Sequence, residues 1–552
     1  MSFAIRSIVK FINFQSAFLK TYHNNYSFQG DFALSKFKFR KNAEIGKLEA
    51  ETDSFLKACF YKSDVFKGIV DFDSSEKNPD FTRRIIVGRT GSGKTALLKQ
   101  IVSSDQVKVH DTIEAENTVF EHINNNIFIS DLINKGIDLR VFYKSLWLHV
   151  LLAKVINQLY RSSYDSFFEY IKSLIKTEKK PYKPEVANEY LEMYKGNFFN
   201  DNAFLEITER MQDQLSGEMN IGLIKIGGLA NDDTTIKIQT ATSSYVSKEL
   251  LRKQKELIKL IKCEFSNEKQ VRIVISIDDL DKSWLSTSAI RYDFINALLE
   301  AFKELLDIKS VKILISIRTD IIMGIYKNSL RQDEKDQSLI YAISWNKIEI
   351  RSILDNRINH LVQNQYQSTK VVKFSDVFNF KVLGEPADEY IISRTMLRPR
   401  DAINFVNLCL AECDGKVDLN EDIVLEAEEK FYSVRKVALV KEWKSIYSHI
   451  ADYLDALSFL KEKFFKISDV PEQIKDRALN YLINRPNDQP NDEEHNNRIL
   501  DFDQLMKVWF TVGVIGIKKS STLTIYSSFE KPELDITDLT KSFEVHPLFF
   551  RH

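Results

Sequence analysis

The chain has 552 residues, enough for about two to four domains and at least one large core. Its 77 Lys and Arg residues are balanced by 78 Asp and Glu residues, so the overall charge does not favour a polyanionic partner. The low content of glycine (17) and proline (10) argues against long fibrous or disordered segments. Four cysteines fit a reducing compartment, and no stretch is long and apolar enough to cross a bilayer, so we expect a cytoplasmic protein without a membrane anchor.

Residues 1–80 are predicted to form an N-terminal helical segment. Residues 1–30 contain no Asp or Glu, which suits a helix that packs onto the body of the protein. A transit peptide or a surface-binding helix is the alternative. Apolar side chains recur at helical spacing from Lys41 to Phe60 and predict a second helix. By analogy with other proteins that carry the loop described next, residues 46–51 are expected near a nucleotide base.

A glycine-rich loop follows an apolar strand at residues 84–87 and precedes a helical pattern. The loop has the pattern G-x-x-x-x-G-K-[ST], in which backbone N–H groups surround a phosphate and glycines leave room for it. The side chain of Lys94 is expected to reach the β- and γ-phosphates, and the Thr95 hydroxyl to bind Mg²⁺. The predicted nucleotide-binding residues here are Gly88, Arg89, Thr90, Gly91, Ser92, Gly93, Lys94 and Thr95.

The predicted core domain runs from residue 81 to residue 350. Residues 118–123 are expected to form a second strand, and Leu139–Tyr160 a long helix. Residues 165–245 look like an insertion of helices. Within it, alternating apolar residues on both sides of Asn231–Asp233 predict a β-hairpin over residues 222–238. This hairpin would serve either as an interaction edge or as ordinary packing.

Two later runs of β-branched residues predict buried parallel strands with polar tips. The run at residues 271–277 ends in Asp278 and Asp279, and the run at residues 311–317 ends in Arg318 and Thr319. Beside a phosphate loop, Asp278 is the expected Mg²⁺ acid and Asp279 the residue that orients the attacking water. Residues 340–343 are a candidate fifth strand. Strands that alternate with helices predict a doubly wound α/β core with its ligand at the carboxyl ends of the strands.

Residues 351–430 read as a helical lid, and residues 431–552 as a separate C-terminal unit. In the lid, Arg398 and Arg400 flank Pro399 at the start of an amphipathic helix, where they are placed to contact a phosphate. In the C-terminal unit, a helix at residues 502–512 and a following hairpin resemble a winged helix. Residues 501–552 carry six Lys or Arg and seven Asp or Glu, a balance that favours protein contact over DNA binding.

Taken together, these motifs resemble the STAND and KAP-like P-loop NTPases. The resemblance is carried by Gly88–Thr95, by the Asp278 and Arg318 strand tips, and by the segment Leu397–Asp401. It implies the ASCE arrangement, with an extra strand between the loop strand and the Mg²⁺-acid strand. It also implies that Arg318 and Thr319 read the γ-phosphate, and that Arg398 or Arg400 is the lid arginine. The position after the Mg²⁺ acid is Asp279 and not Glu, although the Asp-Asp form is common in these families. Because Asp has the shorter reach, hydrolysis is expected to be slow.

The leading hypothesis is therefore an ATP- and Mg²⁺-dependent ATPase that works as a switch or motor subunit, as a homo-oligomer or with a separate effector protein. Lys94, Asp279 and Arg318 are its predicted catalytic residues. Relatives in this resemblance often act in bacterial antiviral defence. One alternative is a nucleotide-gated scaffold with little hydrolysis. The other is a DNA-binding regulator or DNA-stimulated ATPase that uses the winged helix.

Overall fold

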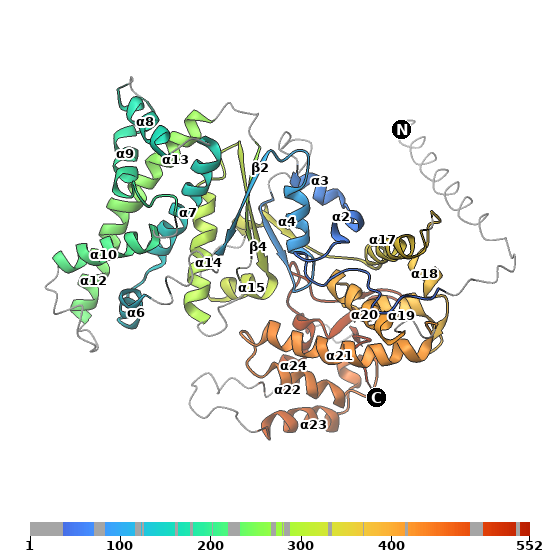
Figure 1. Ribbon diagram of the computed structural model, residues 1–552. Coiled ribbons are helices and arrows are strands. Elements are labelled where there is room, and N and C mark those ends of the chain that lie inside the picture. The colour runs from blue at the N-terminus through green and yellow to red at the C-terminus, as the bar shows by residue number, and fades with distance from the viewer. Residues whose placement is uncertain are drawn as a thin grey trace, which may run out of the picture.

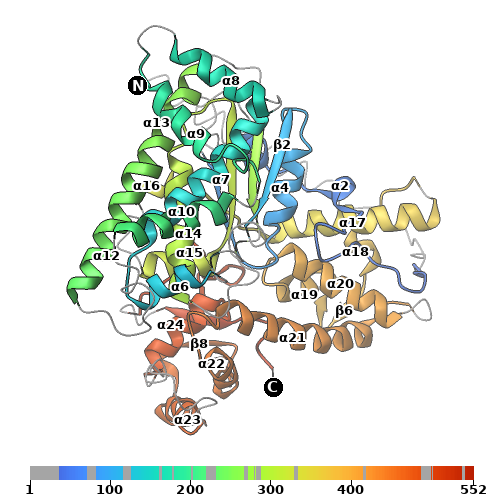
Figure 2. The same cartoon turned by 60° about the vertical axis from the view of Figure 1, so that its left-hand side comes forward.

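A parallel sheet lies at the centre of the computed structural model, with helices on both faces (Figure 1). Figures 1 and 2 both place a helical insertion at one end of the sheet, and the lid helices and C-terminal unit at the other. Among the residues that the structure describes, no helix has the length and apolarity that a membrane crossing requires. The described residues are 37–70, 83–115, 123, 126–160, 164–176, 180–200, 203–218, 232–265, 272–278, 280, 288–328, 334–367, 369–413, 418–485, 499, 501–536 and 541–551.

Five strands form the central sheet in the order β2-β3-β4-β1-β5, and each neighbouring pair is parallel. This order confirms the predicted α/β fold. It also confirms the extra strand, because β4 lies between the phosphate-loop strand β1 and the Asp278 strand β3. The strands are β1 (Ile85–Gly88), β2 (Val109–Glu114), β3 (Ile273–Asp278), β4 (Val311–Arg318) and β5 (Ile340–Ala342).

Alternate residues of the buried strands face two separate hydrophobic layers. Ile85 and Val87 belong to a large cluster with the helices of one face, whereas Ile86 belongs to a smaller cluster on the other face. Because both layers are apolar, the central strands are continuous apolar runs, as parallel strands covered on both sides require. The covering helices are α3 (Asp64–Val70) and α4 (Lys94–Val102) on the small side, and α7 (Arg140–Tyr160), α14 (Ser288–Lys303) and α15 (Thr319–Asn328) on the large side.

The described part of the insertion consists of helices joined by turns. The predicted hairpin is wrong over residues 232–238, which lie in helix α12, and the rest of the predicted range falls outside the described residues. The second strand lies at Val109–Glu114, before the predicted range of 118–123, of which only Ile123 is described and is helical. The insertion contains α8 (Tyr164–Ile175), α9 (Pro184–Met193), α10 (Ala203–Glu218) and α12 (Asp232–Tyr245). It is flanked by α6 (Ile127–Asn134) before it, and by the π-helical segment η3 (Val246–Leu251) and α13 (Arg252–Glu264) after it.

Helices α17 to α21 form the lid, and the N-terminal segment packs against them. The predicted helix over Lys41–Phe60 is present only as α2 (Leu56–Cys59), while the rest of that range forms turns and extended chain that buries Ile45. The lid elements are α17 (Lys347–Tyr366), α18 (Phe374–Val377), β6 (Lys381–Val382), β7 (Glu385–Pro386), α19 (Ala387–Arg394), α20 (Pro399–Cys413) and α21 (Glu421–Trp443).

In its described residues, the C-terminal unit contains a small antiparallel sheet of order β10-β9-β11-β8 packed with three α-helices. Its residues share one hydrophobic cluster with the lid, and α21 runs across residue 430 without a break. The helix and hairpin predicted over residues 502–527 are present. The elements are α22 (Ile450–Ala456), β8 (Phe464–Lys466), α23 (Glu472–Ile483), α24 (Phe502–Val512), β9 (Ile515–Lys518), β10 (Thr524–Ile525) and β11 (Ser542–Val545).

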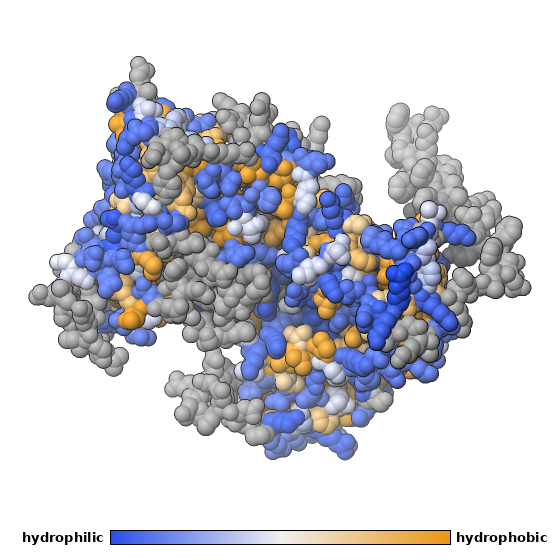
Figure 3. Space-filling model, in the orientation of Figure 1, coloured by the Kyte–Doolittle hydropathy of each residue, from blue (hydrophilic) through white to orange (hydrophobic). Residues whose placement is uncertain are grey.

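The face of the molecule in Figure 3 is mostly hydrophilic, with apolar groups between the charged areas. One such group lies in its lower half, in the region that the lid and C-terminal helices occupy in Figure 1. On α21, Val434 and Val437 are each more than half exposed. These side chains are spaced three residues apart and therefore lie on the same side of the helix.

The shared cluster predicts that the lid and the C-terminal unit lose stability together. Trp509 of α24 is fully buried in it, and its indole Nε1 donates to the Tyr453 carbonyl at 2.6 Å. Trp509→Ala should lower the free energy of unfolding by about 3–5 kcal/mol. Hydrogen exchange should then quicken in α20 as well as in α24. Faster exchange confined to α24 would show that the two parts are separate cooperative units.

Candidate functional site

The phosphate loop joins the end of β1 to the start of α4. Gly91 and Gly93 have φ angles of +80° and +94°, the left-handed region that residues with a Cβ rarely adopt. Gly93 is the N-cap of α4, so the free N–H groups of the first helical turn point into the loop. The loop therefore has the backbone form and the positive helix end that phosphate binding requires.

Side chains from the neighbouring strands meet at this loop. The Thr95 hydroxyl lies 2.8 Å from Oδ2 of Asp278 at the tip of β3, and the Lys94 Nζ donates to the Gly88 carbonyl at 3.1 Å. Gly88 itself lies opposite Arg318 in the β1–β4 register. The hydroxyl and the carboxylate are hard oxygen donors of the kind that Mg²⁺ prefers. Both predicted Mg²⁺ ligands are therefore side by side.

A pocket lies along the inner side of the loop, and we call it the loop pocket. Its floor is Gly91 and Gly93–Ala96, one wall is the N-terminal segment, and the other wall comes from the lid. Arg400 ties the two walls to the floor, because its backbone N–H donates to the Gly91 carbonyl and its Nε to the Leu48 carbonyl. The walls include Leu48, Ala50, Glu51, Tyr61, Trp345, Ile353 and Ile403.

Buried polar contacts hold the N-terminal wall of this pocket. Arg357 of α17 donates to the Ile45 carbonyl at 2.8 Å and forms an ion pair with Asp53 at 2.6 Å. The same carboxylate accepts from the backbone N–H groups of Lys47 and Phe55. One aspartate therefore fixes a segment that has little regular secondary structure of its own.

The outer side of the loop meets the lid and the C-terminal unit through one buried carboxylate, Glu442, whose side chain is 1% exposed. Its Oε1 accepts from Arg89 Nε at 3.3 Å and from the Thr90 N–H at 3.4 Å. Its Oε2 accepts from Arg398 at 3.1 Å and from Arg435 at 3.2 Å. We call Arg89, Arg318, Arg398, Arg435 and Glu442 the Glu442 cluster.

The remaining contacts of the Glu442 cluster reach the start of α15, the end of α24 and the phosphate loop. Arg318 forms a bidentate pair with Asp320 and donates to the Glu442 carbonyl at 3.1 Å. Arg89 donates to the Val512 carbonyl at the end of α24 at 2.6 Å. Arg398 donates to the Thr90 carbonyl at 3.1 Å. The loop, the β4 tip, the lid and the C-terminal unit therefore meet at one point.

The charges of the cluster determine its protonation. Burial alone would raise the pKa of Glu442, but Arg398, Arg89, Arg435 and Arg318 together hold it well below its ordinary value. Burial lowers the pKa of the Arg89 and Arg398 guanidinium groups, which nevertheless stay charged beside the carboxylate. Glu442 is consequently an anion at neutral pH.

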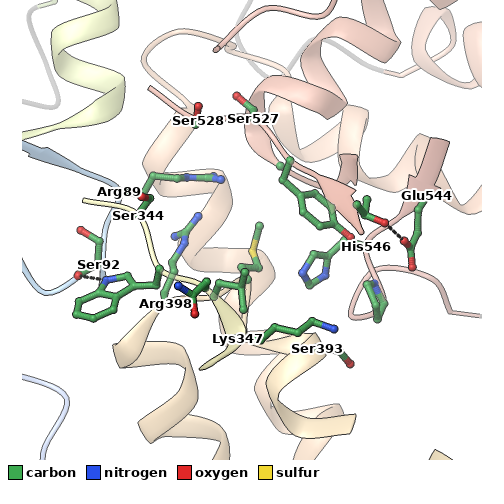
Figure 4. A pocket seen from close by; sticks show the side chains of 18 of the residues that line it. Arg89, Ser92, Ser344, Lys347, Ser393, Arg398, Ser527, Ser528, Glu544 and His546 are labelled. Atoms are coloured by element: carbon green, nitrogen blue, oxygen red, sulfur yellow. Dashed lines mark hydrogen bonds between the residues drawn. The ribbon is translucent and has the colours of Figure 1, made fainter. Parts of the chain in front are cut away.

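Beyond the cluster lies a larger cavity of about 870 Å³ between the β1 tip, the lid and the C-terminal hairpin, which we call the outer cavity (Figure 4). Arg89 and Arg398 lie next to each other on one side of it, and Glu544 and His546 come from the C-terminal unit on the other. Burial lowers the pKa of His546 to about 3, so this imidazole is neutral. Thr319 also lines this cavity, and neither Arg398 nor Thr319 lines the loop pocket.

The structure thus places the sequence-predicted residues in two groups. Gly91, Gly93, Lys94, Thr95 and Arg400 line the loop pocket, with Asp278 bound to Thr95. Gly88, Arg89, Ser92, Thr319 and Arg398 line the outer cavity, while Thr90 and Arg318 contact Glu442. Asp279 lies outside the described residues.

Sequence reasoning missed four residues that organise the site: Glu442, Asp53, Arg357 and Trp345. Glu442 follows Val440-Lys441 in an ordinary amphipathic helix, and Asp53 and Arg357 are 304 positions apart, so no local pattern marks them. The indole Nε1 of Trp345 donates to the Ser92 carbonyl at 2.8 Å, just past the strand that the sequence did indicate.

The sheet order and the glycine loop define an α/β fold of the P-loop type, with an extra strand between the loop strand and the strand that ends in Asp278. Residues 348–440, which span the lid helices, match the family described as the FunZ-associated C-terminal helical domain. No curated protein matches the sequence. The structure of the ORC2 protein of Aeropyrum pernix, in ADPNP and ADP complexes, is similar with a TM-score of 0.33 and 12% identity, over 84% of each chain.

The N-terminal wall of the loop pocket gives a direct test. Gly46 has a φ of +116°, and a Cβ there would overlap the Arg357 guanidinium and the Asp53 carboxylate. Gly46→Ala should release residues 45–55 from α17, at a cost of about 1–3 kcal/mol. Trypsin should then cut after Lys47 or Lys57 more readily. Gly136→Ala is the matched control, since its φ is +72° and its Cβ would meet nothing within 4 Å. Equal cleavage in both variants would contradict the role of Asp53 and Arg357.

Proposed function

We propose that the protein is a Mg²⁺-dependent ATPase that uses nucleotide binding and slow hydrolysis as a conformational switch. The observation that carries the proposal is the 2.8 Å contact between the Thr95 hydroxyl and Asp278, directly under a glycine loop with two left-handed glycines. A P-loop enzyme holds Mg²⁺ with such a hydroxyl and carboxylate, while the loop N–H groups and the lysine bind the phosphates.

The residues of the chain have distinct roles in this proposal. Lys94 neutralises the β- and γ-phosphates, and Thr95 and Asp278 hold Mg²⁺, which would withdraw charge from the phosphoryl oxygens. Arg400 is the lid arginine on the nucleotide side, because it lines the loop pocket whereas Arg398 does not. Asp279 is proposed to orient the attacking water, and Arg318 and Thr319 to report the γ-phosphate from the β4 tip.

The nucleotide base is proposed to lie between residues 46–51 and the lid. This assignment is supported by the position of Leu48 and Glu51 in the wall of the loop pocket, beside the glycine loop. The side chains of Tyr61, Trp345 and Ile353 also line the loop pocket and make it suitable for a flat apolar ring. The preference for ATP over other nucleoside triphosphates rests on the resemblance to STAND and KAP-like NTPases.

The biological setting is proposed from the same resemblance. The protein would act as a homo-oligomer or with an effector protein, in bacterial antiviral defence. The exposed Val434 and Val437 on α21, together with the balanced charge of residues 501–552, support a protein partner over DNA. Their helix ends at the Glu442 cluster, so a partner on this surface would sense the loop directly.

The proposal predicts that Lys94→Ala strongly weakens nucleotide binding and stops turnover. The loss of one charged donor to phosphate should weaken ATP binding by roughly a hundredfold and reduce turnover to background. Calorimetric titration with ATP and Mg²⁺, together with a phosphate-release assay, measures both effects. Lys99→Ala, five positions later in α4, should behave as wild type. If the Lys94→Ala variant keeps its ATP affinity and hydrolysis, the proposed function is refuted. If the wild-type protein binds ATP but does not hydrolyse it, the scaffold alternative is favoured.

A further inference from the structure

The phosphate loop is held from both sides. On its inner side, Arg400 of α20 contacts the Gly91 carbonyl and the N-terminal wall. On its outer side, Glu442 and Arg398 contact Thr90, and Glu442 also contacts Arg89. Because Arg398 and Arg400 both lie at the start of α20, a movement of α20 away from the loop must break contacts on both sides.

The loop pocket is narrow in this arrangement. Its volume is about 130 Å³, whereas pockets that bind drug-sized ligands measure roughly 300–1,000 Å³. A nucleoside triphosphate held wholly between these walls requires them, including α20, to move apart. The Glu442 cluster opposes that movement, since it ties α20 and the end of α21 to Arg89 and Thr90.

Phosphate binding would also change the backbone of the loop at the point where Glu442 accepts its hydrogen bonds. Lys94 Nζ donates to the carbonyls of Gly88 and Arg89 at 3.1 and 3.4 Å. A bound β- or γ-phosphate competes with these carbonyls for the ammonium group, because an anion is the stronger acceptor. Binding thus alters the backbone at Arg89, one residue from the Thr90 N–H that Glu442 accepts.

The net charge of the Glu442 cluster also sets Glu442 against nucleotide binding. The four arginines of the cluster face three carboxylates, which are Glu442 and the ion-pair partners Asp320 and Asp401. The net charge of this group is therefore +1. Neutralising Glu442 makes this charge +2 beside the loop. A more positive surrounding attracts a polyphosphate more strongly, and burial reduces the screening of that attraction.

We propose that Glu442 is a positioning residue that clamps the lid and the C-terminal unit onto the phosphate loop, and that this clamp and bound nucleoside triphosphate oppose each other. The inference rests on the proposed function. Since coupling between two sites is reciprocal, weakening the clamp must tighten nucleotide binding by the same factor by which the nucleotide weakens the clamp. A residue with only a structural role would not produce tighter binding.

The test compares two glutamates of the same helix. Glu428 of α21 is also buried and paired, to Arg394 at 2.9 Å and to the Tyr390 hydroxyl, but it contacts no loop residue. Glu442→Gln should lower the Kd for ATP by about tenfold, the size expected for release of a charged hydrogen bond. Glu428→Gln should leave the Kd within about twofold of wild type while losing comparable stability. Calorimetric titration of the full chain with ATP and Mg²⁺, with thermal unfolding in parallel, gives both quantities.

A second pair of variants keeps every charge. Gly513 follows α24 with a φ of +83°, and a Cβ there would lie 2.6 Å from Arg89 Nη1. Gly513→Ala should displace Arg89 from the Val512 carbonyl and lower the Kd for ATP by about threefold. Gly384→Ala is the control, because its φ is +84° and its Cβ would meet nothing within 4 Å.

The outcomes separate this inference from the proposed function. Tighter ATP binding in Glu442→Gln and Gly513→Ala, but not in their controls, supports the clamp. ATP binding by the wild type with equal or weaker binding in both variants overturns the clamp and leaves the ATPase proposal in place. No ATP binding by the wild type overturns both. If Glu442→Gln does not fold, the Gly513→Ala pair decides the question.

Discussion

The Glu442 carboxylate is the interaction on which the arrangement of this protein depends. An ionised carboxylate without exposure to water is costly unless cations surround it, and here three arginine side chains and one loop N–H supply its contacts. These donors come from the phosphate loop, the start of α20 and the middle of α21. Buried ion pairs of this kind contribute less to net stability than to geometry, because a donor that moves away leaves an uncompensated charge. The cluster consequently requires the loop, the lid and the C-terminal unit to hold one relative position.

The fold was predictable where the pattern of side chains is local. β3 and β4 are continuous apolar runs with polar tips, and the glycine loop followed by a helical pattern identified β1 and α4. The prediction failed where the local pattern is ambiguous. β2 has the sequence Val-His-Asp-Thr-Ile-Glu and lies at the sheet edge, so it lacks the apolar run that marks a buried strand. The alternation within residues 232–238 indicated a strand, but packing of α12 against α10 and η3 favours a helix there.

The residues of the site likewise fall into those that a local pattern predicts and those that depend on distant contacts. The residues of the phosphate loop and Asp278 follow from motif spacing, and the structure brings Thr95 and Asp278 together. The sequence left Arg398 and Arg400 as alternatives for the lid arginine, and the structure separates them, since Arg400 lines the loop pocket and Arg398 the outer cavity. Residues two apart at a helix start point to different sides. The part played by Glu442 depends on contacts across 352 or more positions to the loop, which no window of sequence contains.

In this proposal, nucleotide binding and docking of the C-terminal unit oppose each other. Phosphates bound on the inner side of the loop weaken the contacts of Glu442 with Arg89 and Thr90 on its outer side. The most direct measurement is hydrogen–deuterium exchange of α24 and of the last turns of α21, in the wild-type chain with and without a non-hydrolysable ATP analogue and Mg²⁺. The account predicts faster exchange in these segments when the nucleotide is bound, together with slower exchange in α4. Unchanged or slower exchange in α24 and α21, at nucleotide concentrations that protect α4, would contradict it.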